Sequence, residues 1–169
     1  MDWAATNTCV IGLGRSGVAA VELLLQHGAT VTAVDTAESP ALQQTASALT
    51  AKGATCHLGV KEIPNAFDLA VISPGVRLDL PMIVSLRARG VLVWGELELG
   101  WQFTECPAIA ITGTNGKTTT TELVASLLGQ AQRRTVSVGN IGTPLSAVVA
   151  QSRALDAVTL EVSSFQLET

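Results

Sequence analysis

The segment TCVIGLGRSG, residues 8–17, joins a short apolar run to a turn that contains three glycines. The first four residues are mostly β-branched or apolar, as expected of a buried strand. Beyond the turn, apolar residues return at helical spacing until Gly28, where a helix is expected to end. A strand, a glycine turn and a helix in this order are typical of the first unit of a parallel α/β sheet.

The same alternation continues along the chain and predicts a parallel α/β architecture throughout. Further strands are expected at residues 30–34, 55–58, 69–72 and 91–94, with helices at residues 40–52 and 81–89. A second series follows, with helices at residues 96–103, after residue 116 and near residues 145–150, and with strands at residues 108–112, 135–138 and 158–161. We therefore predict two domains, residues 1–95 and residues 96–169, the second ending just past its third strand.

The composition is that of a globular chain with few charges. Of the 169 residues, 47% are hydrophobic and 14% are charged, which excludes intrinsic disorder. The net charge of −4 argues against a nucleic-acid-binding protein, and no apolar stretch suits a membrane span or a secretion signal. Cys9, Cys56 and Cys106 are too widely spaced for a metal motif, and they predict free thiols in a cytoplasmic protein.

The first glycine turn predicts a nucleotide site. Gly12, Gly14 and Gly17 form the pattern GxGxxG between a strand and a helix, where a diphosphate can approach the backbone amides at the helix N-terminus. Asp35 closes the second expected strand, where such folds place a carboxylate for a ribose or a base. Close packing of strand on helix would also explain the glycines, and the pattern does not identify the nucleotide.

A second glycine turn, TGTNGKTT at residues 112–119, predicts a phosphate cradle. It departs from a standard P-loop because Ile111 stands where that pattern has glycine. Lys117 opens the next helix and can neutralise phosphate charge, while the Thr118 hydroxyl can ligate Mg²⁺. Glu161 ends a later strand, at the sheet edge where a carboxylate that holds Mg²⁺ belongs. Asn140 lies in a third glycine turn, as a turn residue or as a ligand contact.

Five segments, residues 12–17, 73–76, 113–119, 139–144 and 161–168, occur in the order and spacing of the Mur ligases, and the chain resembles the first part of that family. The resemblance implies a Rossmann-like UDP-binding domain followed by the truncated start of a P-loop-type parallel α/β ATPase domain. The turn with Asp35, and SSFQLE at residues 163–168, resemble the branch that adds D-glutamate to UDP-N-acetylmuramoyl-L-alanine. This implies ATP and Mg²⁺ as cofactors, an acyl-phosphate route to the amide, and a cytoplasmic monomer active in peptidoglycan synthesis, cell shape and division.

The resemblance also implies roles for single residues. Substrate contacts are expected at Gly14, Arg15, Ser16, Asp35, Thr36, Gly75, Asn140, Ser163 and Gln166. ATP contacts are expected at Gly113, Thr114, Asn115, Gly116, Lys117, Thr118 and Thr119, and Mg²⁺ ligands at Thr118 and Glu161. Lys117 and Asn140 are the expected catalytic residues. Arg15 departs from the apolar residue of other members, so its side-chain role is open.

Three alternatives stay open on the sequence. An NAD-dependent oxidoreductase would use the first turn and Asp35 but leaves the Lys117 loop unexplained, and a Mg²⁺–NTPase would need a standard P-loop. The third is a UDP-sugar or nucleotide-binding module without catalysis. The family's later histidine metal ligand, carbamylated lysine and C-terminal domain lie beyond Thr169, so we expect this chain by itself to be inactive.

Overall fold

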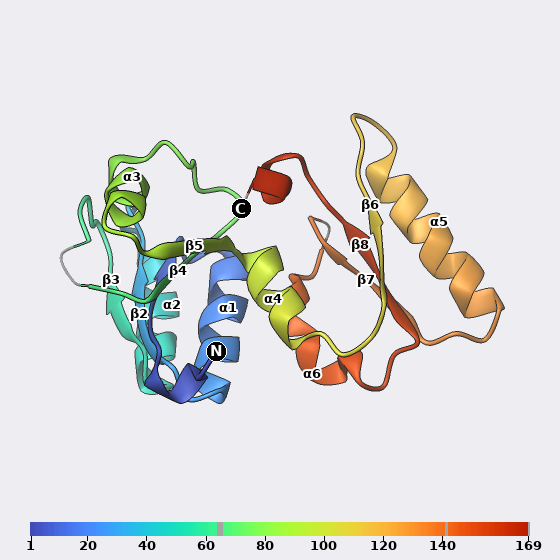
Figure 1. Cartoon of the computed structure of the whole chain (residues 1–169), viewed down its shortest axis with the longest axis horizontal. Helices are drawn as coiled ribbons and strands as arrows, with labels where there is room; N and C mark the ends of the chain where they lie inside the picture. The colour runs from blue at the N-terminus through green and yellow to red at the C-terminus, as the bar shows by residue number, and fades with distance from the viewer. Residues whose placement is uncertain (64–65, 141, 169) are drawn as a thin grey trace. The chain divides into compact units, whose positions relative to one another are not determined.

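The computed structural model describes residues 1–63, 66–140 and 142–168, and the chain divides into two compact units, Met1–Glu96 and Leu97–Thr169 (Figure 1). Ile141 of the third glycine turn and Thr169 lie outside the described residues. Both units are built on parallel sheets, which confirms the predicted α/β class.

The first unit is a five-stranded parallel sheet with the order β3-β2-β1-β4-β5. Its strands are β1 Asn7–Ile11, β2 Thr30–Val34, β3 Thr55–His57, β4 Leu69–Ile72 and β5 Leu92–Gly95. The chain builds outward from β1 on one side and then returns to its other side with β4. The direction of winding therefore reverses between β1 and β4, where open α/β sheets hold their ligands at the carboxyl ends of the strands.

Helices cover both faces of this sheet. They are α1 Arg15–Gln26, α2 Pro40–Ala51 and α3 Pro81–Ala88, with a short 3₁₀ helix at Trp3–Ala5. α1 and α2 lie on one face and α3 lies on the other (Figure 1). The start of α2 shows how the sequence sets its boundary, because proline occupies the first turn and the Ser39 hydroxyl accepts a hydrogen bond from the Leu42 N–H at 3.2 Å.

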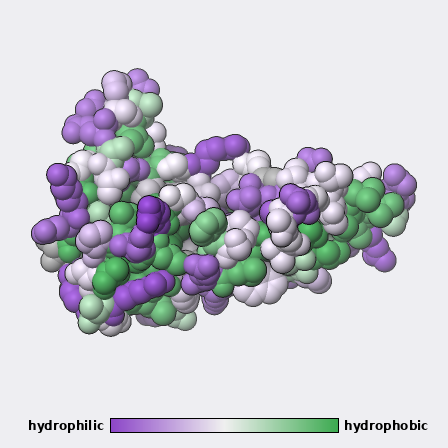
Figure 2. Space-filling view, turned by 90° about the horizontal axis from the view of Figure 1, so that it is seen from above, coloured by the Kyte–Doolittle hydropathy of each residue, from purple (hydrophilic) through white to green (hydrophobic). Residues whose placement is uncertain are grey.

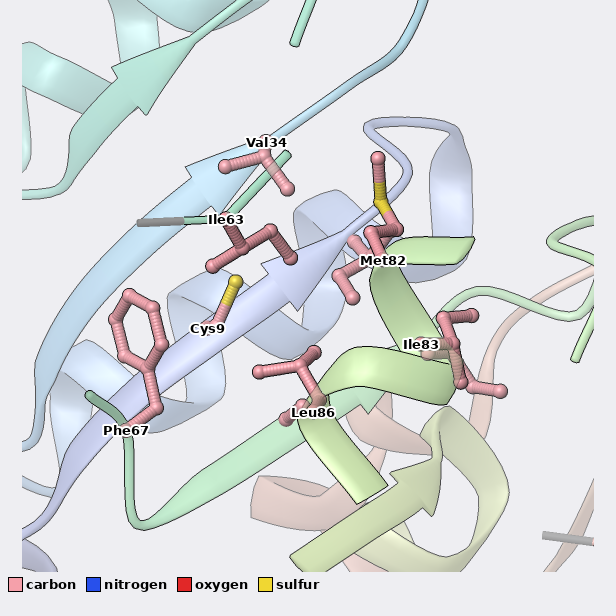
Figure 3. Close-up of a cluster of buried hydrophobic side chains, with 10 residues drawn as sticks. Cys9, Val34, Ile63, Phe67, Met82, Ile83 and Leu86 are labelled. Carbon is pink, nitrogen blue, oxygen red and sulfur yellow. The ribbon is translucent and has the colours of Figure 1, made fainter. Parts of the chain in front are cut away.

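The core between the sheet and α3 is a continuous apolar cluster. Figure 3 shows Cys9 on β1 with Ile63, Phe67 and Leu86 around it. Alternation along β1 explains the arrangement, since Cys9 and Ile11 join this cluster while Val10 between them faces the opposite side. The apolar run of the opening segment is therefore buried on both faces, as in parallel sheets generally.

The second unit is a three-stranded parallel sheet with the order β6-β8-β7. Its strands are β6 Ala108–Ile111, β7 Thr135–Gly139 and β8 Ala157–Glu161. Its helices are α5 Lys117–Gln130 and the short α6 Val149–Ser152, while α4 Glu96–Phe103 leads in from the first unit, and 3₁₀ turns lie at Leu145–Ala147 and Phe165–Glu168. Strand β8, the last in the sequence, lies in the middle of the sheet, so its carboxyl end has a strand end on each side.

One sequence prediction needs correction in this unit. The single helix near residues 145–150 is wrong, because a 3₁₀ turn and α6 meet at Val148, where φ is −111° and ψ is −2°. Burial of Leu145, Val148 and Val149 favours this break, since adjacent β-branched residues gain little from a regular helix. On α5, the apolar residues Leu123 and Leu127 are 56% and 54% exposed.

Hydrophobic residues thus reach the surface among hydrophilic ones, as the space-filling view shows (Figure 2). Across the described parts of the chain, no helix combines the length and the apolarity that a membrane crossing requires.

Candidate functional site

The three glycines of the first turn serve three different needs. Gly12 has φ of +90°, which L side chains rarely adopt. A Cβ on Gly17 would lie 1.8 Å from the Gly12 carbonyl oxygen, so only glycine lets α1 pack this closely on the turn. A Cβ on Gly14, by contrast, would meet no heavy atom of the described residues within 4 Å. Gly14 therefore leaves open space at the N-terminus of α1.

Asp35 is placed against this turn from the end of β2. Its Oδ2 accepts a hydrogen bond from the Leu13 N–H at 2.8 Å, and its Oδ1 accepts one from the Ala37 N–H at 2.9 Å. The carboxylate thus ties the glycine turn to the loop after β2. Thr36, next in the chain, is exposed beside it. The sequence indicated a ligand role for Asp35 but gave no sign of these two backbone bonds.

The turn after β4 completes the same edge of the sheet. The buried Ser73 hydroxyl donates to the Gly12 carbonyl oxygen at 2.8 Å, across the point where the winding reverses. A Cβ on Gly75 would meet no described atom within 4 Å, so the protein itself does not require glycine there. Gly14 and Gly75 are thus glycines that leave space beside neighbouring strand ends.

The N-terminus of α1 provides the polar groups of this edge. Gly14 is the N-cap residue, and the first helical hydrogen bond runs from the Val18 N–H to the Gly14 carbonyl at 3.0 Å. The N–H groups of the first turn, at Arg15 and Ser16, have no partner within a helix and carry its positive dipole end. This arrangement suits an anion such as a diphosphate. The Arg15 side chain itself is exposed.

The phosphate-type loop of the second unit links β6 to α5. Gly113 and Gly116 have φ of +148° and +76°, which lets the backbone turn sharply before the helix. Lys117 is the first residue of α5, and its Nζ donates to the Gly113 carbonyl at 2.8 Å. The ammonium is therefore held over its own loop. Thr114, Asn115 and Thr119 are exposed around it.

Glu161 is the centre of this second site. Its Oε2 accepts a hydrogen bond from the Thr118 hydroxyl at 2.6 Å, and its Oε1 accepts one from the Asn140 Nδ2 at 2.8 Å. The Glu161 side chain is almost fully buried, at 2% exposed. The first turn of α5, the loop after β7 and the end of β8 thus meet on one carboxylate, so the structure brings together three of the residues predicted from sequence.

Backbone geometry fixes the Asn140 side of this network. Asn140 N–H donates to the Glu161 carbonyl at 2.9 Å, as an extension of the ladder between β7 and β8. A Cβ on Gly139 would lie 2.3 Å from that same carbonyl oxygen, so glycine is required for the strand ends to approach. The sequence left the role of the third glycine turn undecided. In the structure, its backbone places the Asn140 side chain against Glu161.

The oxygen atoms here suit one kind of metal. Thr118 and Glu161 supply hard oxygen donors, which Mg²⁺ prefers, and Mg²⁺ commonly takes its remaining ligands from water and phosphate. Within the described ranges, no group of three or more His, Cys, Asp or Glu residues could hold a metal ion alone. The donor set thus fits a Mg²⁺ ion shared with a phosphate, and it does not fit zinc.

Ser163 and Gln166 lie just past Glu161 and bond to each other. The Gln166 Oε1 accepts from the Ser163 N–H at 2.9 Å and lies 3.0 Å from the Ser163 hydroxyl, which in turn accepts from the Gln166 N–H at 3.3 Å. Gln166 is buried and Ser163 half-buried. These bonds close the turn after β8, a role that the sequence did not indicate.

Parallel sheets with glycine turns at the carboxyl ends of their strands define a two-unit α/β protein with a Rossmann-like first unit. Residues 6–95 match the model of the Mur ligase MurD-like N-terminal domain, and residues 111–169 match that of the Mur ligase middle domain. The chain belongs to the Mur ligase family, which confirms the resemblance.

Curated relatives agree with this assignment, and a solved structure shares the fold. The chain is 43% identical to UDP-N-acetylmuramoylalanine–D-glutamate ligase of Frankia casuarinae over 99% of its own length and 36% of the relative's. It is 46% identical to the Myxococcus xanthus enzyme of the same name over 94% of this chain and 36% of that one. It thus spans little more than a third of these relatives. The fold resembles UDP-N-acetylmuramate-alanine ligase MurC from Thermotoga maritima, with a TM-score of 0.52 and 21% identity over 94% of this chain and 37% of that one.

Proposed function

We propose that the chain is the substrate-binding domain and the start of the ATP-binding domain of a ligase that joins D-glutamate to UDP-N-acetylmuramoyl-L-alanine. The observation that carries the proposal is the contact of Glu161, at the end of β8, with Thr118 in the first turn of α5 and with Asn140 just past β7, beside the Lys117 loop. The names of the relatives supply the substrates. Three free cysteines suit the cytoplasm, where thiols stay reduced.

In the first unit, the N-terminus of α1 would bind the diphosphate of the UDP group. Backbone N–H groups at Arg15 and Ser16 point their donors to that end of the helix, and the open space at Gly14 and Gly75 lets a phosphate approach. Asp35 and Thr36 would border the uridine. Because both Asp35 oxygens already accept one backbone N–H, ligand contacts there would use the remaining lone pairs.

In the second unit, Lys117 would bind the ATP phosphates, with the backbone of residues 113–119 around them. Thr118 and Glu161 would hold Mg²⁺, and the Asn140 amide would contact substrate. Bound Mg²⁺ supplies positive charge that stabilises the phosphates during transfer. A carboxylate needs activation before an amine can displace its oxygen. In the proposed route ATP phosphorylates the alanine carboxylate and leaves as ADP, and the D-glutamate amine then displaces phosphate from the acyl phosphate to form the amide.

The 169-residue chain by itself is expected to bind ligands without forming the amide, because it spans little more than a third of its relatives. A second candidate, a UDP-sugar-binding module without chemistry, would keep the first site and have no use for the second. Binding of ATP with Mg²⁺ at the Lys117 loop separates the two candidates.

A tryptophan-fluorescence titration of the chain with UDP-N-acetylmuramoyl-L-alanine tests the proposal. Trp3 and Trp94 report on the first unit, where their rings lie 6.3 Å apart between centroids. Saturable binding of the UDP-sugar, with little response to NAD, is expected. Saturation by NAD with none by the UDP-sugar would refute the proposal, and a Gly14→Ala variant that binds as tightly as the wild type would contradict the placement of the site.

A further inference from the structure

We propose that Ser73 is a positioning residue for the diphosphate site, because its hydroxyl fixes the orientation of the peptide unit between Gly12 and Leu13. The inference rests on the proposed binding of a uridine diphosphate ligand by the first unit. Neither the glycine pattern nor the family match assigns this role.

The peptide unit between Gly12 and Leu13 is held at both of its polar ends. Its carbonyl oxygen accepts the Ser73 hydroxyl at 2.8 Å, from the end of β4. Its N–H donates to the Asp35 carboxylate at 2.8 Å, from the end of β2. These two strands flank β1 on opposite sides, so the turn that follows β1 is anchored to both of its neighbours.

Packing explains why the carbonyl needs this partner. The Gly12 oxygen points towards α1, where a Cβ on Gly17 would come within 1.8 Å of it and within 2.8 Å of the Ser73 hydroxyl oxygen. Gly12 is half-buried and Ser73 is buried, so loss of this hydrogen bond would leave the carbonyl oxygen short of a partner, at a cost in free energy. Without the hydroxyl, rotation of this peptide unit is the way for the carbonyl to find another partner.

Rotation of that unit would move the site. Gly14, the N-cap of α1, is only one residue beyond Leu13, so the direction in which the chain enters the helix depends on the Gly12–Leu13 peptide. The positions of the N–H groups in the first turn of α1 depend on that direction. Ser73 therefore acts on the diphosphate through the turn.

The test measures ligand affinity of the whole chain for the variants Ser73→Ala and Ser47→Ala. Ser47 on α2 is a matched control, since its hydroxyl also donates to a backbone carbonyl at 2.8 Å, but on an exposed helix face. Ser73→Ala is expected to weaken binding of UDP and of UDP-N-acetylmuramoyl-L-alanine about tenfold, the scale of one lost hydrogen bond. Ser47→Ala is expected to leave both affinities within about twofold.

Two further readouts separate positioning from loss of stability. Binding of uridine, which lacks phosphate, should change less than about twofold in Ser73→Ala, because only the phosphate contacts are displaced. Amide hydrogen exchange of Leu13, followed by NMR, should become faster, while exchange within α1 at Ala20 stays as in the wild type.

The possible failures are distinguishable. If the wild-type chain binds neither UDP nor the UDP-sugar, the proposed function is wrong and this inference falls with it. If the wild type binds and Ser73→Ala binds equally well, only the inference is overturned. Equal loss of uridine and UDP affinity, or an equal loss in Ser47→Ala, would also overturn it, since either result would indicate a general effect on the fold.

Discussion

The hydroxyl of Thr118 donates to the carboxylate of Glu161 at 2.6 Å, although 43 positions separate the two residues in the chain. The bond joins the first turn of α5 to the end of the central strand of the second sheet. Both oxygens are thereby held at the separation of a hydrogen bond. If they bind Mg²⁺ as proposed, the Thr118 hydroxyl proton must turn away from the carboxylate so that both oxygens face the ion.

Replacing Glu161 with glutamine is expected to weaken the Mg²⁺ dependence of ATP binding. The substitution keeps the size of the side chain and removes its charge, so the affinity gain from Mg²⁺ should fall at least about tenfold. Calorimetric titration with a non-hydrolysable ATP analogue, with and without Mg²⁺, measures this. Glu122→Gln, at an exposed position of α5, is the control. Undiminished Mg²⁺ dependence in Glu161→Gln would place the metal elsewhere.

Alanine at Gly17 should lower mainly the stability of the fold, whereas alanine at Gly14 should lower mainly the affinity for the UDP-sugar. In Gly17→Ala the new Cβ collides with the Gly12 carbonyl, so the free energy of unfolding should fall by at least about 2 kcal/mol. In Gly14→Ala the Cβ enters open space, so stability should fall by no more than about 1 kcal/mol while UDP-sugar affinity drops tenfold or more. Urea unfolding and fluorescence titration measure the two quantities. A large stability loss in Gly14→Ala would show that the space is occupied.

Asp35→Ala should lower both stability and UDP-sugar affinity. The substitution removes the acceptor of the Leu13 and Ala37 N–H groups, which is expected to cost about 1–3 kcal/mol of unfolding free energy. Asp79→Ala is the control, because Asp79 pairs with Arg77 on the surface and such pairs contribute little. Urea unfolding distinguishes the roles of Asp35: a variant as stable as the wild type with weakened binding would make it a ligand contact only.

The three thiols should differ sharply in reactivity. Burial raises the pKa of the Cys9 thiol to about 12, with a small opposing effect of Arg89, and burial also raises the pKa of Cys106. Cys56 is only partly buried. Because the thiolate is the reactive form, a disulfide reagent at pH 8 should label Cys56 first, and Cys9 and Cys106 only as the chain unfolds. Equal rates at all three positions would contradict the burial pattern.

The Cys9 shift also predicts an alkaline loss of stability. The folded chain keeps this proton up to about pH 12, whereas the unfolded chain releases it near pH 9, the ordinary value. The stabilisation is therefore complete below pH 9 and is lost as the pH rises towards 12, by up to about 1.4 kcal/mol per pH unit. Urea unfolding across this range should show a shallower decline in Cys9→Ala than in the wild type.

Local patterns in the sequence predicted most of the fold. Strand β4 is a continuous apolar run, β2 consists mostly of β-branched residues, and α2 begins at a Ser-Pro pair, so each carries a local signal. The segment around Val148 carries no such signal, because its break arises from the burial of adjacent apolar residues against the rest of the unit.

Bonds between distant residues could not be predicted in the same way. Residue types and spacing placed Thr118 at a helix start, Asn140 in a turn and Glu161 at a strand end, but did not show that one carboxylate binds both of the others. The hydrogen bond from Ser73 to Gly12 was also not predictable from the sequence, because it depends on which strands are neighbours in the sheet. These partners follow from strand order, which no short motif encodes.

Strand order also determines at which stage of synthesis each sheet can form. In the first unit the earliest strand, β1, is central, so β2, β3, β4 and β5 can each join an existing edge as synthesis proceeds. In the second unit β6 and β7 do not pair with each other, and each finds its partner only when β8 has been made. A nascent chain halted before residue 157 would therefore carry one finished sheet and two strands with unpaired edges, the kind of surface that chaperones bind.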